Sequence, residues 1–117
     1  MSADKSRDLD YIERISIYCG QVAQSLSEID NSHEVFMERI TYQNAVAMCI
    51  LQIGELVKNL SPEFIESHEE IPWHLIAKTR DTYAHHYGNV DFELVWDTAI
   101  NDLPPLRAFC LKQLSEN

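Results

Sequence analysis

The stretch AVAMCIL, residues 45–51, is apolar on every side of the helix that its composition favours. A helix without a polar face lies at the centre of a bundle or in a subunit interface. Good helix formers surround the stretch, so we expect one helix from about His33 to Leu60. Gly54 interrupts these residues at a cost of about 1 kcal/mol relative to alanine. Close approach of another backbone is one reason to keep a glycine there.

The chain before this helix also has a helical pattern. Apolar residues recur every three or four positions between about Asp8 and Ser27, which predicts a first helix with one buried face. Residues 28–32 read as a turn, and Ser32 is the candidate N-cap of the central helix.

Prolines and caps divide the second half of the chain into further helices. Ser61-Pro62 predicts a short helix, and Pro72 starts another that runs to about His86. Gly88 and Asn89 are residue types that close a helix in the left-handed conformation. Asp91 caps a helix through about Asn101, and two prolines, Pro104 and Pro105, kink or restart it. The prediction is an all-α, up-and-down bundle of four or five helices in one domain, residues 1–117.

Composition narrows the class of protein. The three cysteines, Cys19, Cys49 and Cys110, are far apart and form no CxxC pair, so we expect buried free thiols in a reducing cytoplasm. The N-terminus lacks the apolar run of a signal peptide, and no apolar run is long enough for a membrane span. The net charge of −10 argues against a broad basic face for duplex DNA. Nucleic acid would have to bind at a small local site, while the acidic surface serves solubility or a basic partner.

One such local site is RDTYAHHYGN, residues 80–89. Four of the five histidines lie between residues 68 and 86, together with Lys78 and Arg80. On an ideal helix Arg80 and Tyr87 share a face within about 20°, whereas Arg80 and His85 are about 140° apart. A tightened last turn, the length of arginine, or a second copy across a two-fold axis would bring Arg80 and His85 together.

Metal binding, nucleophilic catalysis and metal-free RNA cleavage are the candidate chemistries for this cluster. Asp81 and His85, at i and i+4, supply only two metal ligands, and the chain has no HExxH or ExxH motif. No GxSxG segment is present for a serine nucleophile, and no cysteine lies near His85 in the sequence. Single histidines are most often surface or packing residues. Metal-free RNA cleavage fits the cluster better, because the ribose supplies the nucleophile while histidine and arginine supply proton transfer and positive charge.

The residues from Arg80 to Tyr87 match an Rx4HxY pattern, in which His85 is the histidine and His86 fills the variable position. Flanking segments fit as well: IGE at 53–55, IPW at 71–73, VW at 95–96 and DLP at 102–104. In this combination the chain resembles HepT-like toxins of the HEPN superfamily over about residues 40 to 107.

The resemblance implies a cytoplasmic, homodimeric, metal-independent endoribonuclease that needs no cofactor and acts on RNA such as tRNA. Arg80 and His85 are the implied catalytic residues, with Asp81 and His86 in support. Tyr87 aligns with the tyrosine that a cognate MntA-type nucleotidyltransferase antitoxin modifies with AMP. No membrane or duplex DNA partner is implied.

Residues outside the motif receive more ordinary roles. Gly54 and Glu55 are expected to serve packing or an interface, and Trp73 and Trp96 to form core or dimer contacts. Two other functions remain open: a non-catalytic HEPN dimer that binds nucleotide or a nucleotidyltransferase, and a purely structural helical dimer.

Overall fold

The structure is a computed structural model that describes residues 3–85 and 89–117, with the side chains of residues 5–82 and 89–117. Every regular element in these ranges is helical, so the all-α prediction is confirmed. No helix of the described part has the length and apolar character needed to cross a membrane. The elements are α1 (Ala3–Ser27), α2 (His33–Glu38), α3 (Ile40–Lys58), α4 (Pro62–Ser67), α5 (Trp73–His85), α6 (Phe92–Asp97), the π-helical turn η1 (Thr98–Asp102) and α7 (Leu103–Glu116).

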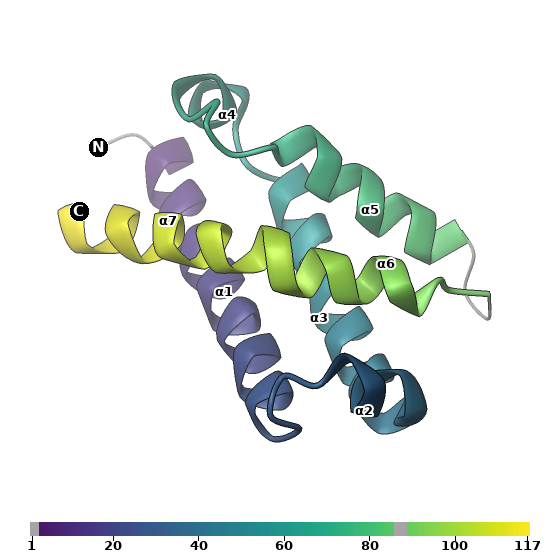
Figure 1. The fold of residues 1–117 in the computed structure, drawn as a ribbon. Coiled ribbons are helices and arrows are strands. Elements are labelled where there is room, and N and C mark those ends of the chain that lie inside the picture. Colours follow the sequence, from purple (N-terminus) through teal and green to yellow (C-terminus); the bar gives the residue numbers. More distant parts are fainter. Residues whose placement is uncertain (1–2, 86–88) are drawn as a thin grey trace.

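Helix α3 lies at the centre of the molecule, as its apolar middle predicted. It packs against α1 and α5, while α7 packs against α1. In Figure 1, α6 and α7 follow each other nearly end to end, and the start of α1 lies at the same end of the molecule as the end of α7. The largest fully buried side chains come from several helices and include Ile12, Ile15, Phe36, Ile50, Ile53 and Leu106. One side of α3 stays open, since Met48 is 51% exposed.

The single helix expected from His33 to Leu60 is wrong, because the chain breaks at Arg39. Arg39 has φ −115° and ψ 98°, an extended conformation that ends α2 and precedes α3. The buried amide of Gln43 donates to the carbonyl oxygens of Phe36 and Met37, both at 3.0 Å. The Phe36 oxygen also accepts from the Arg39 amide at 3.3 Å, and the Gln43 side chain adds a second donor where α2 ends. No proline or glycine marks the break, so helix propensity alone could not reveal it.

The predicted caps form as the sequence indicated. The hydroxyl of Ser32 accepts from the Val35 amide, and that of Ser61 accepts from the Phe64 amide, both at 3.2 Å. Asp91 accepts from the first amides of α6. Before Ser32, Asp30 and Asn31 have φ of 56° and 54°, which these two residue types tolerate in a tight turn.

The two prolines restart the last helix through a widened turn. The Leu103 amide bonds to the carbonyl of Thr98, five residues back, which is the π-helical spacing of η1. Pro104 and Pro105 have no amide hydrogen, so they fit the first turn of α7, where no helical partner is needed. The chain thereby continues from α6 into α7 without a loop.

The cysteines and tryptophans have packing roles. All three thiols are free and buried, and burial raises the pKa of Cys19 and of Cys110 to about 12, so both stay protonated at neutral pH. Trp73 is 4% exposed and donates its ring N–H to the carbonyl of His68 at 2.8 Å. Trp96 packs against Phe36 at a ring distance of 5.3 Å. Both tryptophans therefore serve the core or its edge within one chain.

Candidate functional site

Arg80 lies where α5 approaches α3 most closely. A Cβ added to Gly54 would stand 2.1 Å from the Cβ of Arg80 and 2.7 Å from its Cγ. Real Cβ contacts are never that short, so only glycine at this position of α3 lets α5 come so near. The backbone approach expected from Gly54 is confirmed, and it fixes the base of the Arg80 side chain.

The guanidinium of Arg80 is held by two carboxylates. Its Nη2 lies 3.2 Å from Oε2 of Glu55 on α3, and its Nη1 lies 3.3 Å from Oδ1 of Asp81. The Arg80 side chain is 28% exposed, so part of it remains open to solvent. Each carboxylate engages a different nitrogen, and a guanidinium has five N–H donors, so donors remain for another anion.

Lys58, in the last turn of α3, extends this arrangement. Its Nζ lies 2.9 Å from the same Asp81 oxygen that Arg80 contacts. The Lys58 hydrogen bond, with Arg80 beside it, holds the pKa of Asp81 below its usual range, so Asp81 is ionised at neutral pH. We call these four residues, Glu55, Lys58, Arg80 and Asp81, the α3–α5 charge network.

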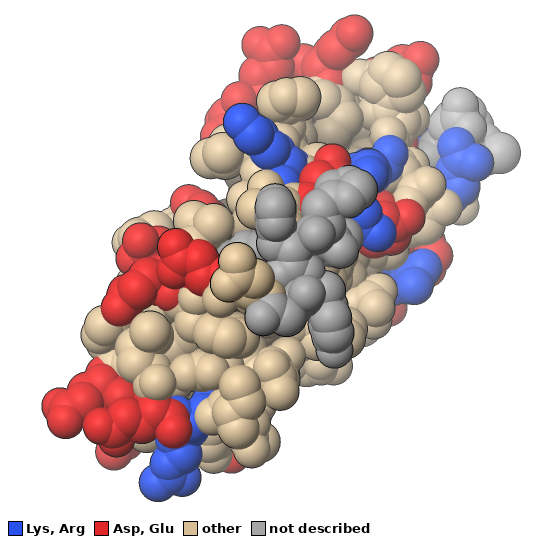
Figure 2. Space-filling view, turned by 90° about the vertical axis from the view of Figure 1, so that its right-hand side faces the viewer, with Lys and Arg blue, Asp and Glu red and all other residues tan. Residues whose placement is uncertain are grey.

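The charge network contains two cations and two carboxylates, which balance. Figure 2 shows the face that carries the C-terminal end of α5, and basic and acidic side chains lie next to one another there beside the grey residues. The described side chains visible in this view do not form one continuous basic surface. That agrees with the expectation, from the net charge, of a small local site.

The other predicted site residues lie at the edge of the described structure. The backbone is α-helical as far as His85, so positions 80 and 85 stay about 140° apart around the helix axis. The side chain of His85 lies outside the described residues, as do His86 and Tyr87 entirely. The structure therefore places Arg80 and Asp81 together, and the roles of His85, His86 and Tyr87 stay predictions.

The histidine cluster seen in the sequence is partly dispersed by the fold. His68 packs its ring against Phe64 and Phe109, with centroids 4.6 and 5.1 Å away. His74 is exposed in the first turn of α5. Among the described side chains, no group of three histidine, cysteine, aspartate or glutamate residues could hold a metal ion. Asp81, one of the two metal-ligand candidates in the 80–89 stretch, instead pairs with Lys58 and Arg80.

Sequence reasoning missed Glu55 and Lys58. Glu55 was assigned to packing or an interface, and Lys58 was not singled out. Their position next to Gly54 in the sequence could have indicated them. Where a glycine allows α5 to approach α3 closely, the residues that follow it on α3 come within reach of Arg80. Glu55 and Lys58 are three residues apart, so they lie on adjoining positions of one helix face.

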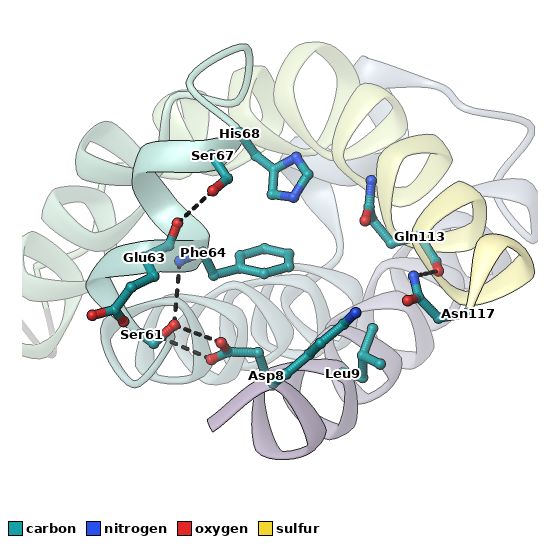
Figure 3. A pocket seen from close by; sticks show the side chains of 10 residues that line it. Asp8, Leu9, Ser61, Glu63, Phe64, Ser67, His68, Gln113 and Asn117 are labelled. Atoms are coloured by element: carbon teal, nitrogen blue, oxygen red, sulfur yellow. Dashed lines mark hydrogen bonds between the residues drawn. The ribbon is translucent and has the colours of Figure 1, made fainter. Parts of the chain in front are cut away.

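A separate hollow of about 440 Å³ lies where α1, α4 and the end of α7 meet. Figure 3 shows the Asp8 carboxylate accepting hydrogen bonds from Ser61, whose hydroxyl in turn accepts from the Phe64 amide. Asp8 is 3% exposed, and its bonds to the Ser61 amide and hydroxyl measure 2.8 and 2.6 Å. This contact ties α1 to the start of α4 and contributes to stability.

Comparison with known proteins identifies the family. The model of the "Ribonuclease HepT-like" family matches residues 8–112. The chain belongs to the HepT-like ribonuclease family. The match covers both helices that carry the charge network, and Arg80 and Asp81 are the first two residues of the Rx4HxY motif.

Several relatives of this HepT-like chain carry names that describe them as ribonucleases. "Putative RNase TTE0752" of Caldanaerobacter subterraneus subsp. tengcongensis is 34% identical over 91% of this chain and 89% of its own length. "Probable ribonuclease HepT" of Thermococcus cleftensis is 35% identical over 84% of this chain and 87% of its own. "Putative RNase MJ0127" of Methanocaldococcus jannaschii is 37% identical, but the alignment spans only 64% of this chain and 62% of that protein. No solved structure matches the chain.

Proposed function

We propose that this HepT-like protein is a metal-independent endoribonuclease that cleaves RNA, with tRNA as the first substrate to test. The observation that carries the proposal is the placement of Arg80 in a chain of a ribonuclease family. Gly54 brings α5 against α3, and two carboxylates hold the partly exposed guanidinium. A cation fixed in this way is suited to a crowded phosphate, whose charge increases toward the transition state.

The proposed reaction uses groups that the RNA and this chain supply. A base removes the proton of the ribose 2′-hydroxyl, and the 2′-oxygen attacks the adjacent phosphorus. The bond from phosphorus to the 5′-oxygen breaks, and an acid protonates the leaving oxygen. Arg80 neutralises the phosphate, and His85 transfers one of the protons, because histidine titrates near neutral pH. Asp81 and Glu55 orient the guanidinium, with His86 as a neighbouring proton donor.

A second copy of the chain completes the site in this proposal. Positions 80 and 85 lie on different sides of α5, so an imidazole from a partner helps to surround one phosphate. The open side of α3 supports such pairing. Met48 is 51% exposed and lies seven residues before Glu55, close to the same helix face. We therefore place the dimer contact on this side, with the two Arg80/His85 pairs facing a shared cleft.

Control of the activity is proposed to come from a MntA-type nucleotidyltransferase antitoxin that adds AMP to Tyr87. On a continuing helix, position 87 lies within about 20° of position 80. The added phosphate would carry negative charge toward the Arg80 guanidinium and compete with RNA there. Co-expression with the antitoxin is expected to give a protein heavier by one AMP, measured by intact mass. A Tyr87→Phe variant should lack that addition and stay toxic, and an unmodified Tyr87 in the co-expressed protein would contradict the proposal.

The test of the nuclease itself is RNA cleavage in the presence of a chelator. Purified wild-type protein is expected to cut a tRNA pool in EDTA, and His85→Ala is expected to lose at least about 100-fold in rate, as for loss of a general acid or base. Cleavage that EDTA abolishes would instead indicate a metal enzyme. The same variants expressed in cells should separate toxic from harmless protein.

A non-catalytic dimer is the second candidate, and the pairing of Arg80 favours it. Both observed partners of the guanidinium are carboxylates of the same chain, so any RNA or nucleotide must compete with them. A protein that only binds nucleotide or a nucleotidyltransferase would show affinity without turnover. Equal growth of wild type and His85→Ala, with no cleavage specific to wild type, would support this reading.

A further inference from the structure

We propose that Lys58 and Arg80 form a two-cation phosphate site that Asp81 occupies in the free protein. The inference rests on the proposed function, because it assigns RNA phosphates as the ligand. It adds Lys58 to the site as a second phosphate contact. It also gives Asp81 a role in tuning affinity, in addition to orienting Arg80.

The geometry shows that the two cations are neighbours. Nζ of Lys58 and Nη1 of Arg80 both contact one oxygen, Oδ1 of Asp81, at 2.9 and 3.3 Å. They come from different helices, α3 and α5, whose spacing is fixed by Gly54. A carboxylate oxygen between two cations has the charge and hydrogen-bonding capacity of a phosphate oxygen. Asp81 thus marks the place where a phosphate would be attracted.

Because the Lys58–Asp81 pair is exposed to solvent, replacing Asp81 by an RNA phosphate costs little free energy. The Lys58 and Asp81 side chains are 41% and 43% exposed, so their pair is a surface salt bridge. Such pairs contribute little to stability, because water and salt screen them. RNA can therefore separate Lys58 from Asp81 at little cost. Glu55 remains as a partner that keeps Arg80 oriented while Asp81 is displaced.

The charge of the whole chain makes this arrangement useful. The chain has nine basic and nineteen acidic residues, so its net negative charge repels RNA at long range. Lys58 and Arg80 are two adjacent cations that can attract a phosphate locally. Asp81 lowers that attraction in the free protein, which would disfavour weakly bound anions. RNA that engages both cations at once would overcome the competition.

The experiment measures binding of a short single-stranded RNA to the His85→Ala protein, which should bind without cutting. Fluorescence anisotropy at several salt concentrations gives the dissociation constant and its salt dependence. Adding Lys58→Gln is expected to weaken binding roughly three- to tenfold and to lower the salt slope by about 0.7, the value for one phosphate contact on a single strand. Lys58→Arg should restore most of the affinity. Lys112→Gln, an exposed lysine of α7, is the matched control and should change neither slope nor fold.

Asp81→Asn provides the second arm, since the amide keeps the shape and removes the charge. It is expected to tighten binding roughly two- to fivefold, with a smaller gain when Lys58→Gln is also present. Unchanged affinity and slope in folded Lys58→Gln protein would overturn the inference while leaving the nuclease proposal intact. Weaker binding by Asp81→Asn would also overturn it, because Asp81 would then only support Arg80. If the wild-type protein cuts no RNA and the His85→Ala protein binds none, the proposed function itself is overturned.

Discussion

Gly54→Ala is expected to lower the free energy of unfolding by about 1–3 kcal/mol, the usual range for overpacking a fitted interface. The new Cβ would lie 2.1 Å from the Cβ of Arg80, which is no flexible side-chain end. Helices α3 and α5 must therefore move apart. In an exposed helix the same change would stabilise by about 1 kcal/mol, so the sign of the effect is itself informative. Urea unfolding followed by circular dichroism measures it.

The same substitution should also reduce RNA cleavage strongly, because separating α3 from α5 moves Arg80 away from Glu55. Gly20→Ala on α1 is the matched control. Its Cβ would lie 3.4 Å from Nη2 of Arg107, the mobile end of a long side chain. We expect Gly20→Ala to be neutral or stabilising by up to about 1 kcal/mol, with wild-type cleavage. A Gly54→Ala protein as stable and as active as wild type would show that the close α3–α5 contact is not required.

Arg80→Lys is expected to lower RNA cleavage at least about 100-fold while the fold is kept, as is typical when a transition-state donor is removed. Lysine keeps the positive charge but offers one nitrogen, whereas Arg80 meets Glu55 and Asp81 through two. The ammonium could not hold both carboxylates and present a planar donor set to phosphate. Cleavage of tRNA in EDTA, with thermal unfolding as the fold check, measures the effect.

Arg80→Ala should reduce cleavage at least as much, and Lys78→Ala gives the matched control. Lys78 is an exposed cation on the same helix, two residues earlier. Its loss changes the net charge of the chain as much as Arg80→Ala does, but leaves the charge network intact. Near-normal cleavage by Arg80→Lys would argue that only charge matters at this position. Equal losses in Lys78→Ala and Arg80→Ala would indicate a general electrostatic effect.

The parts of the fold that the sequence predicts are those formed by contacts between residues close together in the chain. Ser32, Ser61 and Asp91 cap helices because each side chain reaches amides only two or three residues away. Such contacts depend on sequence neighbours alone. The break at Arg39 depends instead on Gln43, which satisfies the carbonyls of α2 from within the folded core. That contact exists only after α2 and α3 have packed.

The candidate site likewise contains residues that the sequence predicted and residues that only the structure shows. Arg80 and Asp81 were found from their motif, because adjacent residues of a helix end are visible in the sequence. Glu55 and Lys58 were not, since they belong to a helix more than twenty residues earlier in the chain. Their link to Arg80 and Asp81 depends on how closely two helices approach.

The sequence by itself therefore determined the helical class, the caps, the central place of α3 and the family motif around Arg80. Periodicity, capping and residue type act over a few neighbours, so they can be read along the chain. Only the tertiary structure decided the break at Arg39 and the pairing of Arg80 and Asp81 with Glu55 and Lys58. Those features require atoms distant in sequence to meet, and the meeting at Arg80 is permitted by the missing side chain of Gly54.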